Sequence, residues 1–329
     1  MVKVGFIGTG GISRAHLDYL KTRDDVQICA LCDVNEQNLK QRVQAYGGRA
    51  FNDFRNMLAQ MELDAIWVCT PPEVRREPLV ACVEKGIPVF CEKPVERSAQ
   101  QGASIAGELS RLNARVQIGY LFRSMPAVQR LRQYIDDDRI HTVQSVYICN
   151  MSLERNLPAW FYDKELSGGP LVDQATHNLD LLRSLLGEVH QVSGLALNPH
   201  KQKESGYTID ETIALSFVFE HGIVGTHIHS WLGDAWRNEI VLSGQKGLYR
   251  IDLNKGQVNC ERDSETTTFG QGSRRIFEFE DELFLRQVID RDWSTNPCDY
   301  ADGLNSLRLT LACNRAVESD GSPCTVDQG

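Results

Sequence analysis

The first ~120 residues alternate short apolar runs with longer amphipathic segments, and this order constrains the fold more than any other feature of the chain. Strands that alternate with helices predict βαβ units and a parallel sheet. The runs are apolar almost throughout, which is typical of strands that are covered on both faces. We expect strands at Val2–Ile7, Val26–Cys32, Ala65–Cys69, Val89–Cys91 and Val116–Gly119, and helices at Ile12–Leu20, Glu36–Tyr46, Phe54–Gln60 and Pro78–Lys85.

The pattern changes after about Phe122, where several strand patterns follow one another with short turns between them. Such an order predicts a large, mainly antiparallel open sheet. The sequence therefore predicts an α/β domain over residues 1–122 and an α+β domain over residues 123–329. Strands are expected at Val143–Leu153, Val189–Ala196, Thr212–Phe219, Ile223–Trp231, Arg237–Ser243, Leu248–Leu253 and Ile276–Phe279, and helices at Ala127–Asp137, Leu171–Leu186, Glu282–Arg291 and Tyr300–Ser319.

Composition and charge exclude several classes of protein. The 329 residues include 35 Lys and Arg against 44 Asp and Glu, a net charge of −9, which argues against nucleic acid or an anionic membrane as a partner. No window approaches ~18 consecutive apolar residues, and we do not expect the N-terminal run Met1–Gly8 to be a signal peptide. We therefore expect a cytoplasmic protein. Its ten cysteines, including the Cys29 and Cys32 pair within one expected strand, are interpreted as thiols.

A glycine-rich loop, residues 8–13 (GTGGIS), lies between the first strand and the first helix. This is the place where the pyrophosphate of a dinucleotide meets a helix N-terminus. Gly8 permits a tight turn there, and Gly10 lets main-chain amides approach the phosphates. Any strand–helix turn favours glycine, so the motif alone is a weak signal. The residues expected to contact the cofactor are Gly8, Gly10, Gly11 and Ile12.

Asp33 strengthens this interpretation, because it ends the second strand about 20 residues beyond the loop, the spacing of a carboxylate that binds the adenosine ribose. An acidic residue here repels a 2′-phosphate, so NAD is favoured over NADP. The alternative is that Asp33 is a solvated loop residue or a cap for the helix that begins near Asn35.

Two further strands end in residues suited to the nicotinamide side of the cofactor. Thr70 and Pro71 follow one of these strands, and Glu92-Lys93 follows the strand Val89–Cys91. Such positions lie at the carboxyl edge of a parallel sheet, where ligands bind. Lys93 can donate hydrogen bonds to a substrate oxygen and stabilise the charge that develops there; the alternative is a lysine in a solvated turn. We expect all four residues to bind the cofactor.

The expected helix at Leu171–Leu186 contains Asp173, His177 and Asp180 at i, i+4 and i+7, on one face. Histidine is the side chain best suited to move protons near neutral pH, so His177 is a candidate base. A structural alternative exists for each residue, because the helix dipole alone favours Asp173 in a first turn and most helical histidines are structural.

Together these motifs resemble those of the Gfo/Idh/MocA oxidoreductases, a family that includes glucose–fructose oxidoreductase and inositol 2-dehydrogenase. The resemblance extends over essentially the whole chain and rests on the glycine loop, the Glu92-Lys93-Pro94 turn, residues 119–123 (GYLFR) and residues 168–177. It implies a Rossmann domain, then a substrate domain whose open sheet often forms the oligomer interface, and hence a homodimer or homotetramer.

By the same resemblance, Lys93 matches the catalytic lysine of the family. Asp173 and His177 match residues that contact the substrate hydroxyl, with the histidine as the usual proton acceptor. The chain departs from the family pattern at residues 168–170 (GGP) and 174–176 (QAT), which implies a reshaped pocket.

Other candidates have weaker support. Trp160, in the run 160–162 (WFY), can form an apolar wall against a sugar ring or belong to a packing cluster, and Arg123 can face the substrate or form a structural salt bridge. His227 and His229 share one strand face, a spacing that can hold a metal, but we interpret them as ordinary sheet residues and expect no metal site. The acidic runs 136–138 and 278–282 are expected on the solvated surface.

The sequence thus predicts an NAD(P)-dependent oxidoreductase that transfers a hydride between the nicotinamide and a secondary hydroxyl or ketone of a sugar, polyol or related small molecule. Two alternatives remain open. One is a redox-neutral glycosidase of the same fold that holds NAD tightly, and the other is a non-catalytic NAD-binding scaffold or sensor.

Overall fold

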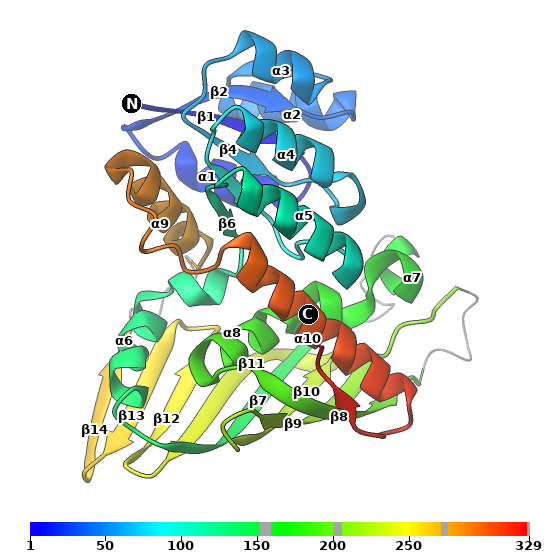
Figure 1. Ribbon diagram of the computed structural model, residues 1–329, viewed down its shortest axis with the longest axis vertical. Helices are drawn as coiled ribbons and strands as arrows, with labels where there is room; N and C mark the ends of the chain where they lie inside the picture. The colour runs from blue at the N-terminus through cyan, green and yellow to red at the C-terminus, as the bar shows by residue number, and fades with distance from the viewer. Residues whose placement is uncertain (152–158, 200–205, 271–275, 328–329) are drawn as a thin grey trace. The chain divides into compact units, whose positions relative to one another are not determined.

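The computed structural model describes residues 1–151, 159–199, 206–270 and 276–327. The chain divides into two compact units, each built from two segments (Figure 1). The first unit comprises Met1–Leu121 and Phe277–Leu304, and the second comprises Phe122–Ile276 and Asn305–Gly329.

The first unit contains a six-stranded parallel sheet with the order β3-β2-β1-β4-β5-β6. This is the strand order of the Rossmann fold, in which ligands bind beyond the carboxyl ends of the strands, where the order reverses. The expected α/β fold is therefore confirmed. Its strands are β1 (Val2–Ile7), β2 (Val26–Cys32), β3 (Arg49–Phe51), β4 (Ala65–Val68), β5 (Val89–Cys91) and β6 (Val116–Ile118), and its helices are α1 (Ser13–Leu20), α2 (Glu36–Tyr46), α3 (Phe54–Gln60), α4 (Arg76–Glu84), α5 (Ala99–Arg111) and α9 (Ile276–Asp290).

Helix α9 belongs to the first unit although it lies far along the chain. The ring of Phe284 packs edge-on against Trp67 at 5.0 Å and against Phe90 at 5.7 Å between ring centroids. The strand expected at Ile276–Phe279 is wrong, because these residues form the first turn of α9. The short Ile-Phe-Glu-Phe run alternates like a strand, but Phe277 and Phe284 are seven residues apart and share one helical face.

The second unit contains a nine-stranded sheet with the order β14-β13-β12-β11-β7-β10-β9-β8-β15. Strands β7 and β10 pair in parallel and the other neighbours pair antiparallel, which confirms the expected, mainly antiparallel sheet. Its strands are β7 (Ile140–Asn150), β8 (Val189–Leu197), β9 (Thr212–Phe219), β10 (Val224–Ser230), β11 (Leu232–Gly244), β12 (Gly247–Asp252), β13 (Gln257–Arg262), β14 (Glu265–Phe269) and β15 (Cys324–Thr325). The end of the strand expected at Val143–Leu153 lies outside the described residues.

One face of this sheet is covered by helices, including α6 (Pro126–Ile135) and α8 (Thr176–Leu186), which contact β13 and β7 (Figure 1). The strict alternation of buried and exposed residues along β9 and β10 shows that the opposite face is open. Helix α10 (Tyr300–Glu318) follows near the end of the chain. Among the described residues, no helix has the length and apolar character needed to cross a membrane.

Candidate active site

The glycine loop follows β1 directly, and the backbone conformation and packing of the loop require a glycine at position 8. Its φ of +90° is unfavourable for any other residue, and an added Cβ would lie 2.7 Å from the carbonyl carbon of Cys69. By contrast, a Cβ on Gly10 or Gly11 would meet no atom within 4 Å. Packing does not demand glycine at these two positions, so the open space beside them fits the close approach of a dinucleotide to the main chain.

Asp33 lies at the end of β2 and is bound to this loop. Its Oδ2 accepts hydrogen bonds from the main-chain N of Thr9 at 2.6 Å and from Thr9 Oγ1 at 2.8 Å. Its Oδ1 accepts a bond from Asn35 N at 2.8 Å. The cap of α2 is Asn35, whose side chain accepts from Asn38 N, so Asp33 is not the helix cap that the sequence left open. The loop and the carboxylate expected to bind the ribose therefore lie together.

The loops after β4 and β5 are tied to each other by Arg75, which is 3% exposed. Its guanidinium donates hydrogen bonds to the main-chain oxygens of Thr70, Glu92 and Pro94. Thr70 Oγ1 is buried with no hydrogen-bond partner among the described residues. Since Thr70 and Lys93 lie on adjacent strand ends, the first unit brings together the residues that the sequence assigned to the nicotinamide side, and Arg75 is a residue that sequence reasoning missed.

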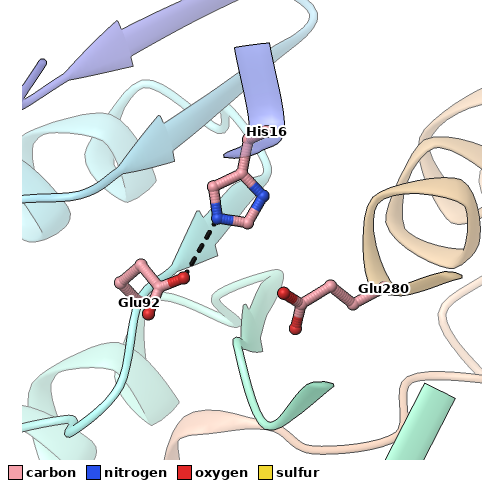
Figure 2. A group of neighbouring side chains, drawn as sticks. All are labelled: His16, Glu92 and Glu280. Carbon is pink, nitrogen blue, oxygen red and sulfur yellow. Dashed lines mark hydrogen bonds and ion pairs between the residues drawn. The ribbon is translucent and has the colours of Figure 1, made fainter. Parts of the chain in front are cut away.

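Glu92 points away from solvent and is 4% exposed. Its Oε2 accepts a hydrogen bond from the main-chain N of Lys93 at 3.1 Å. Its Oε1 lies 3.0 Å from His16 Nε2 (Figure 2). The peptide bond that follows, Lys93–Pro94, is cis.

His16 is the centre of a buried group that also contains Glu92, Glu280 and Asp281; we call it the His16 cluster. Nδ1 of His16 lies 2.8 Å from Asp281 Oδ1, which also accepts a hydrogen bond from Trp67 Nε1 at 2.8 Å. Glu280 is 1% exposed, and both of its carboxyl oxygens are buried without a hydrogen-bond partner among the described residues. Glu280 and Asp281 lie in the acidic run 278–282, so the expectation that this run is solvated is wrong for these two residues.

The ionisation of the cluster follows from burial and charge. Burial by itself lowers the pKa of His16, but the charges and hydrogen bonds of Asp281 and Glu92 outweigh it and raise this pKa well above its ordinary value. Burial by itself raises the pKa of Glu92, but His16, Lys93 and Arg75 bring it below the ordinary value. For Glu280, burial outweighs the opposing charges of His16 and Lys93 and, with the neighbouring carboxylates adding to it, raises the pKa well above the ordinary value.

In the second unit, Asp173 and His177 lie where a π-helical turn (Leu171–Ala175) runs into α8. π-Helical turns are rare and frequent at functional sites. Both side chains are half-buried, and the ring of Phe122 packs edge-on against His177 at 5.6 Å. Asp173, His177 and Asp180 were expected on one face of a regular helix, and the wider π-helical turn alters the spacing on which that expectation depends. Asp180 is fully buried.

The departure from the family pattern at Gln174 has a structural basis. Gln174 Oε1 accepts a hydrogen bond from Trp231 Nε1 at 2.7 Å and lies 3.3 Å from Cys149 Sγ. Trp231 is fully buried, so the glutamine fastens the π-helical turn to the sheet beneath it.

Arg123 forms a structural salt bridge, one of the two roles that the sequence left open for it. It is 3% exposed and forms two hydrogen bonds to the Asp180 carboxylate, at 2.7 and 2.6 Å. Ser306 donates a further bond to Asp180 at 2.5 Å. The structure therefore places Arg123 in a buried ion pair rather than among exposed substrate contacts.

Trp160 and the paired histidines differ in their environment. Trp160 is 50% exposed and contacts Phe161, which stacks on Trp231 at 5.2 Å, so the aromatic run contributes both an exposed ring and a packing cluster. His227 and His229 lie on the buried face of β10, and burial lowers the pKa of His227 to about 3 and that of His229 well below its ordinary value.

Comparison with known proteins identifies the family. The model of an oxidoreductase family with an NAD-binding Rossmann fold, GFO_IDH_MocA, matches residues 2–120, and the model of the GFO/IDH/MocA C-terminal domain matches residues 128–250. The chain belongs to the Gfo/Idh/MocA oxidoreductase family. The resemblance of its sequence motifs is thereby confirmed. Together with the fit of the glycine loop and Asp33 to a dinucleotide, this makes the chain an NAD-dependent oxidoreductase.

Its relatives and structural neighbours are dehydrogenases and oxidoreductases. The chain is 25% identical to an uncharacterized oxidoreductase of Bacillus subtilis, over 99% of this chain and 97% of the relative. It is 24% identical to myo-inositol 2-dehydrogenase of Thermotoga maritima, over 98% of each. The structure of a levoglucosan dehydrogenase in complex with NADH and levoglucosan covers 100% of both chains with a TM-score of 0.86 at 19% identity. A Lactobacillus casei scyllo-inositol dehydrogenase with bound NAD(H) and scyllo-inositol covers 99% of both, with a TM-score of 0.84 at 20% identity, so the fold is shared.

Proposed function

We propose that this enzyme oxidises a secondary hydroxyl of a sugar or polyol with NAD, or reduces the corresponding ketone with NADH. The observation that carries the proposal is the arrangement at the carboxyl edge of the first sheet. There the glycine loop follows β1, Asp33 follows β2 and the Lys93 turn follows β5, all strands of one parallel sheet. The names of relatives aligned over nearly their whole length, such as myo-inositol 2-dehydrogenase, support the class of substrate.

The reaction requires two groups beside the nicotinamide. Removal of hydride from a carbinol carbon is accompanied by loss of the hydroxyl proton, so a base and a group that stabilises the alkoxide must converge on that oxygen. We assign the base to His177 and the stabilising ammonium to Lys93, with Asp173 orienting either the hydroxyl or the imidazole. The bound NAD supplies the hydride acceptor.

The test is turnover on a panel of polyols and sugars, followed at the absorbance band of NADH. We expect Lys93→Ala and His177→Ala each to lower kcat by on the order of 10²–10⁴, the range for a positioned acid–base group. NAD affinity should barely change in His177→Ala, because that side chain is not assigned to the dinucleotide. Arg130 is exposed on helix α6 of the second unit, so Arg130→Ala is a control that should keep normal turnover.

Two outcomes contradict this assignment. Near-normal turnover in His177→Ala would move the base to another group. Conversion of a glycoside without net NADH would instead establish the redox-neutral glycosidase.

We also propose that the enzyme is a homodimer or homotetramer assembled through the open face of the second sheet, and that it works in the cytoplasm. The support for assembly is an apolar surface across neighbouring strands, which a monomer would leave in water. Sedimentation of the unchanged protein and of an Ile228→Lys variant tests it, and a monomeric unchanged protein would contradict it. The exposed apolar residues of this surface are Leu195, Leu197, Val218, Val224, Ile228, Leu232 and Trp236.

A further inference from the structure

The His16 cluster has no part in the function proposed so far, although it adjoins Lys93. It joins three elements of the first unit, namely α1, the end of β5 and α9 (Figure 2). Three carboxyl groups and one imidazole are removed from water there, which is costly unless the charges are paired. The arrangement therefore needs either a bound cation or a proton.

The donor chemistry favours the proton. His16, Glu92 and Glu280 present ligand atoms that all lie within 4.8 Å of one another, a spacing that a metal ion can bridge. However, each ring nitrogen of His16 faces a carboxylate oxygen, at 2.8 and 3.0 Å. An ionised carboxylate accepts and does not donate. The pKa of His16 is raised and that of Glu92 is lowered, so both ring nitrogens are donors and the ring is an imidazolium. An imidazolium has no lone pair with which to bind a metal.

The imidazolium then contributes one positive charge against two carboxylates. The His16 imidazolium lies between the carboxylates of Glu92 and Asp281, and a third carboxylate at Glu280 would have no counter-charge within hydrogen-bond reach. Both Glu280 oxygens lack a hydrogen-bond partner among the described residues, so the neutral acid is the form that this environment tolerates best.

The cluster reaches Lys93 through Glu92. The Glu92 carboxylate binds His16 with one oxygen and the main-chain N–H of Lys93 with the other. Gly119 leaves room for this arrangement, because a Cβ there would lie 3.3 Å from Glu92 Oε1. Asp281 therefore holds the His16 ring from one side, and the ring binds Glu92 on the other. Glu92 in turn binds the main-chain N–H at the start of the lysine turn.

We propose that His16 is a positioning residue for Lys93, and that as an imidazolium it keeps Glu92 ionised and bonded to the main chain of the lysine turn. The proposal rests on the catalytic role proposed above for Lys93. Protonated Glu92 would present a hydroxyl where a carboxylate oxygen now accepts, and the hold on Lys93 would weaken.

Within the described residues, ionisable groups face the pair from several elements. From α9 come Asp281 and the neutral Glu280, and from the loops at the strand ends come the cations of Lys93 and Arg75. The thiols of Cys69 and Cys91 also interact with Glu92, and burial raises their pKa values. If the imidazolium is removed, burial raises the pKa of Glu92 with less to oppose it. Its titration then moves upward into the working pH range.

The decisive experiment is the pH profile of kcat at saturating NAD for His16→Gln, whose amide can donate to Glu92 but bears no charge. We expect the acid limb to move to higher pH by at least about one unit, the effect of losing a close opposite charge. On this limb, kcat falls on the order of tenfold relative to the unchanged protein and recovers as the pH is raised. Asp281→Asn, which retains the imidazole, should give a smaller shift in the same direction and serves if His16→Gln does not fold.

Two controls separate positioning from general destabilisation. Leu17→Ala removes a fully buried side chain from the same helix and should lower Tm without moving the acid limb. Glu280→Gln imitates the neutral acid and should leave both kcat and the pH profile unchanged.

Several results would overturn the proposal. An unmoved acid limb in both His16→Gln and Asp281→Asn would show that the cluster only packs. Stoichiometric divalent metal that copurifies with the protein and is lost in Glu280→Gln would place a metal rather than a proton in the cluster. Normal turnover in Lys93→Ala would instead defeat the proposed function, whereas a loss there with unchanged His16 variants defeats only this inference.

Discussion

Replacement of Asp33 with alanine tests the part of the site on which cofactor choice depends. A carboxylate offers about four lone-pair sites, and Asp33 uses three of them on the main-chain N of Thr9, on Thr9 Oγ1 and on the main-chain N of Asn35. One site therefore remains for a ribose hydroxyl, and a second becomes available if the Thr9 hydroxyl rotates away. Asp33→Ala removes this acceptor and the negative charge that opposes a 2′-phosphate.

The expected loss of NAD affinity follows from the one hydrogen bond that Asp33 still has free for the ribose. A hydrogen bond to a charged group contributes about 1.5–3 kcal/mol, so loss of one ribose bond weakens NAD binding by roughly 10- to 150-fold. NADP binding should weaken less or improve, because the like-charge repulsion is gone. The preference for NAD over NADP should therefore fall by at least about tenfold.

Titration calorimetry with NAD and NADP measures both affinities directly. Thr9→Val is the matched control, because it removes one bond to Asp33 and leaves the carboxylate in place, and its NAD affinity should stay within about threefold of the unchanged protein. An NAD affinity in Asp33→Ala equal to that of the unchanged protein would refute the reasoning. Equal affinity of the unchanged protein for NADP and NAD would refute it as well.

Three further predictions concern stability. Asp180→Ala removes the carboxylate that pairs with the buried Arg123 guanidinium, which should cost about 3–5 kcal/mol and lower Tm by roughly 6–20 °C in calorimetry; a change below about 2 °C would contradict the role of the pair. Gly8→Ala should cost at least about 1–3 kcal/mol from its positive φ and abolish NAD binding, as equilibrium denaturation and titration will show, and a variant that still binds NAD normally would count against the tight turn. Strong reductant should leave Tm and activity unchanged, because the ten cysteines are free thiols and burial raises the pKa of Cys91 to about 11 and that of Cys82 to about 12; loss of structure on reduction would disprove this.

Local patterns explain why much of the first unit could be predicted. The helices Glu36–Tyr46 and Phe54–Gln60 begin and end at the residues expected. The side chains of Asn35 and Asp53 cap their N-termini, which explains where the two helices begin. Gly8 of the glycine loop was recognisable because its positive φ permits few other residues. These features depend on neighbours a few positions away, and the sequence displays such neighbours directly.

The linkage between Asp33 and the glycine loop could also be anticipated. Its partner Thr9 is 24 residues away, but β1 and β2 are adjacent parallel strands, and the carboxyl ends of such strands meet at one edge of the sheet. A βαβ unit therefore determines this contact once it is recognised.

Only the tertiary structure determined that Glu280 and Asp281 are buried beside His16. By itself an acidic run on a surface helix is most simply solvated, since buried carboxylates are costly. That cost is offset by an imidazole 265 residues from Asp281 in the chain, and no local pattern reports a partner at such a distance. The roles of Arg75, which binds three main-chain oxygens, and of Asp180, which pairs with Arg123, were hidden for the same reason: the charge of each residue is visible in the sequence, but the atoms that satisfy it are brought to it only by folding.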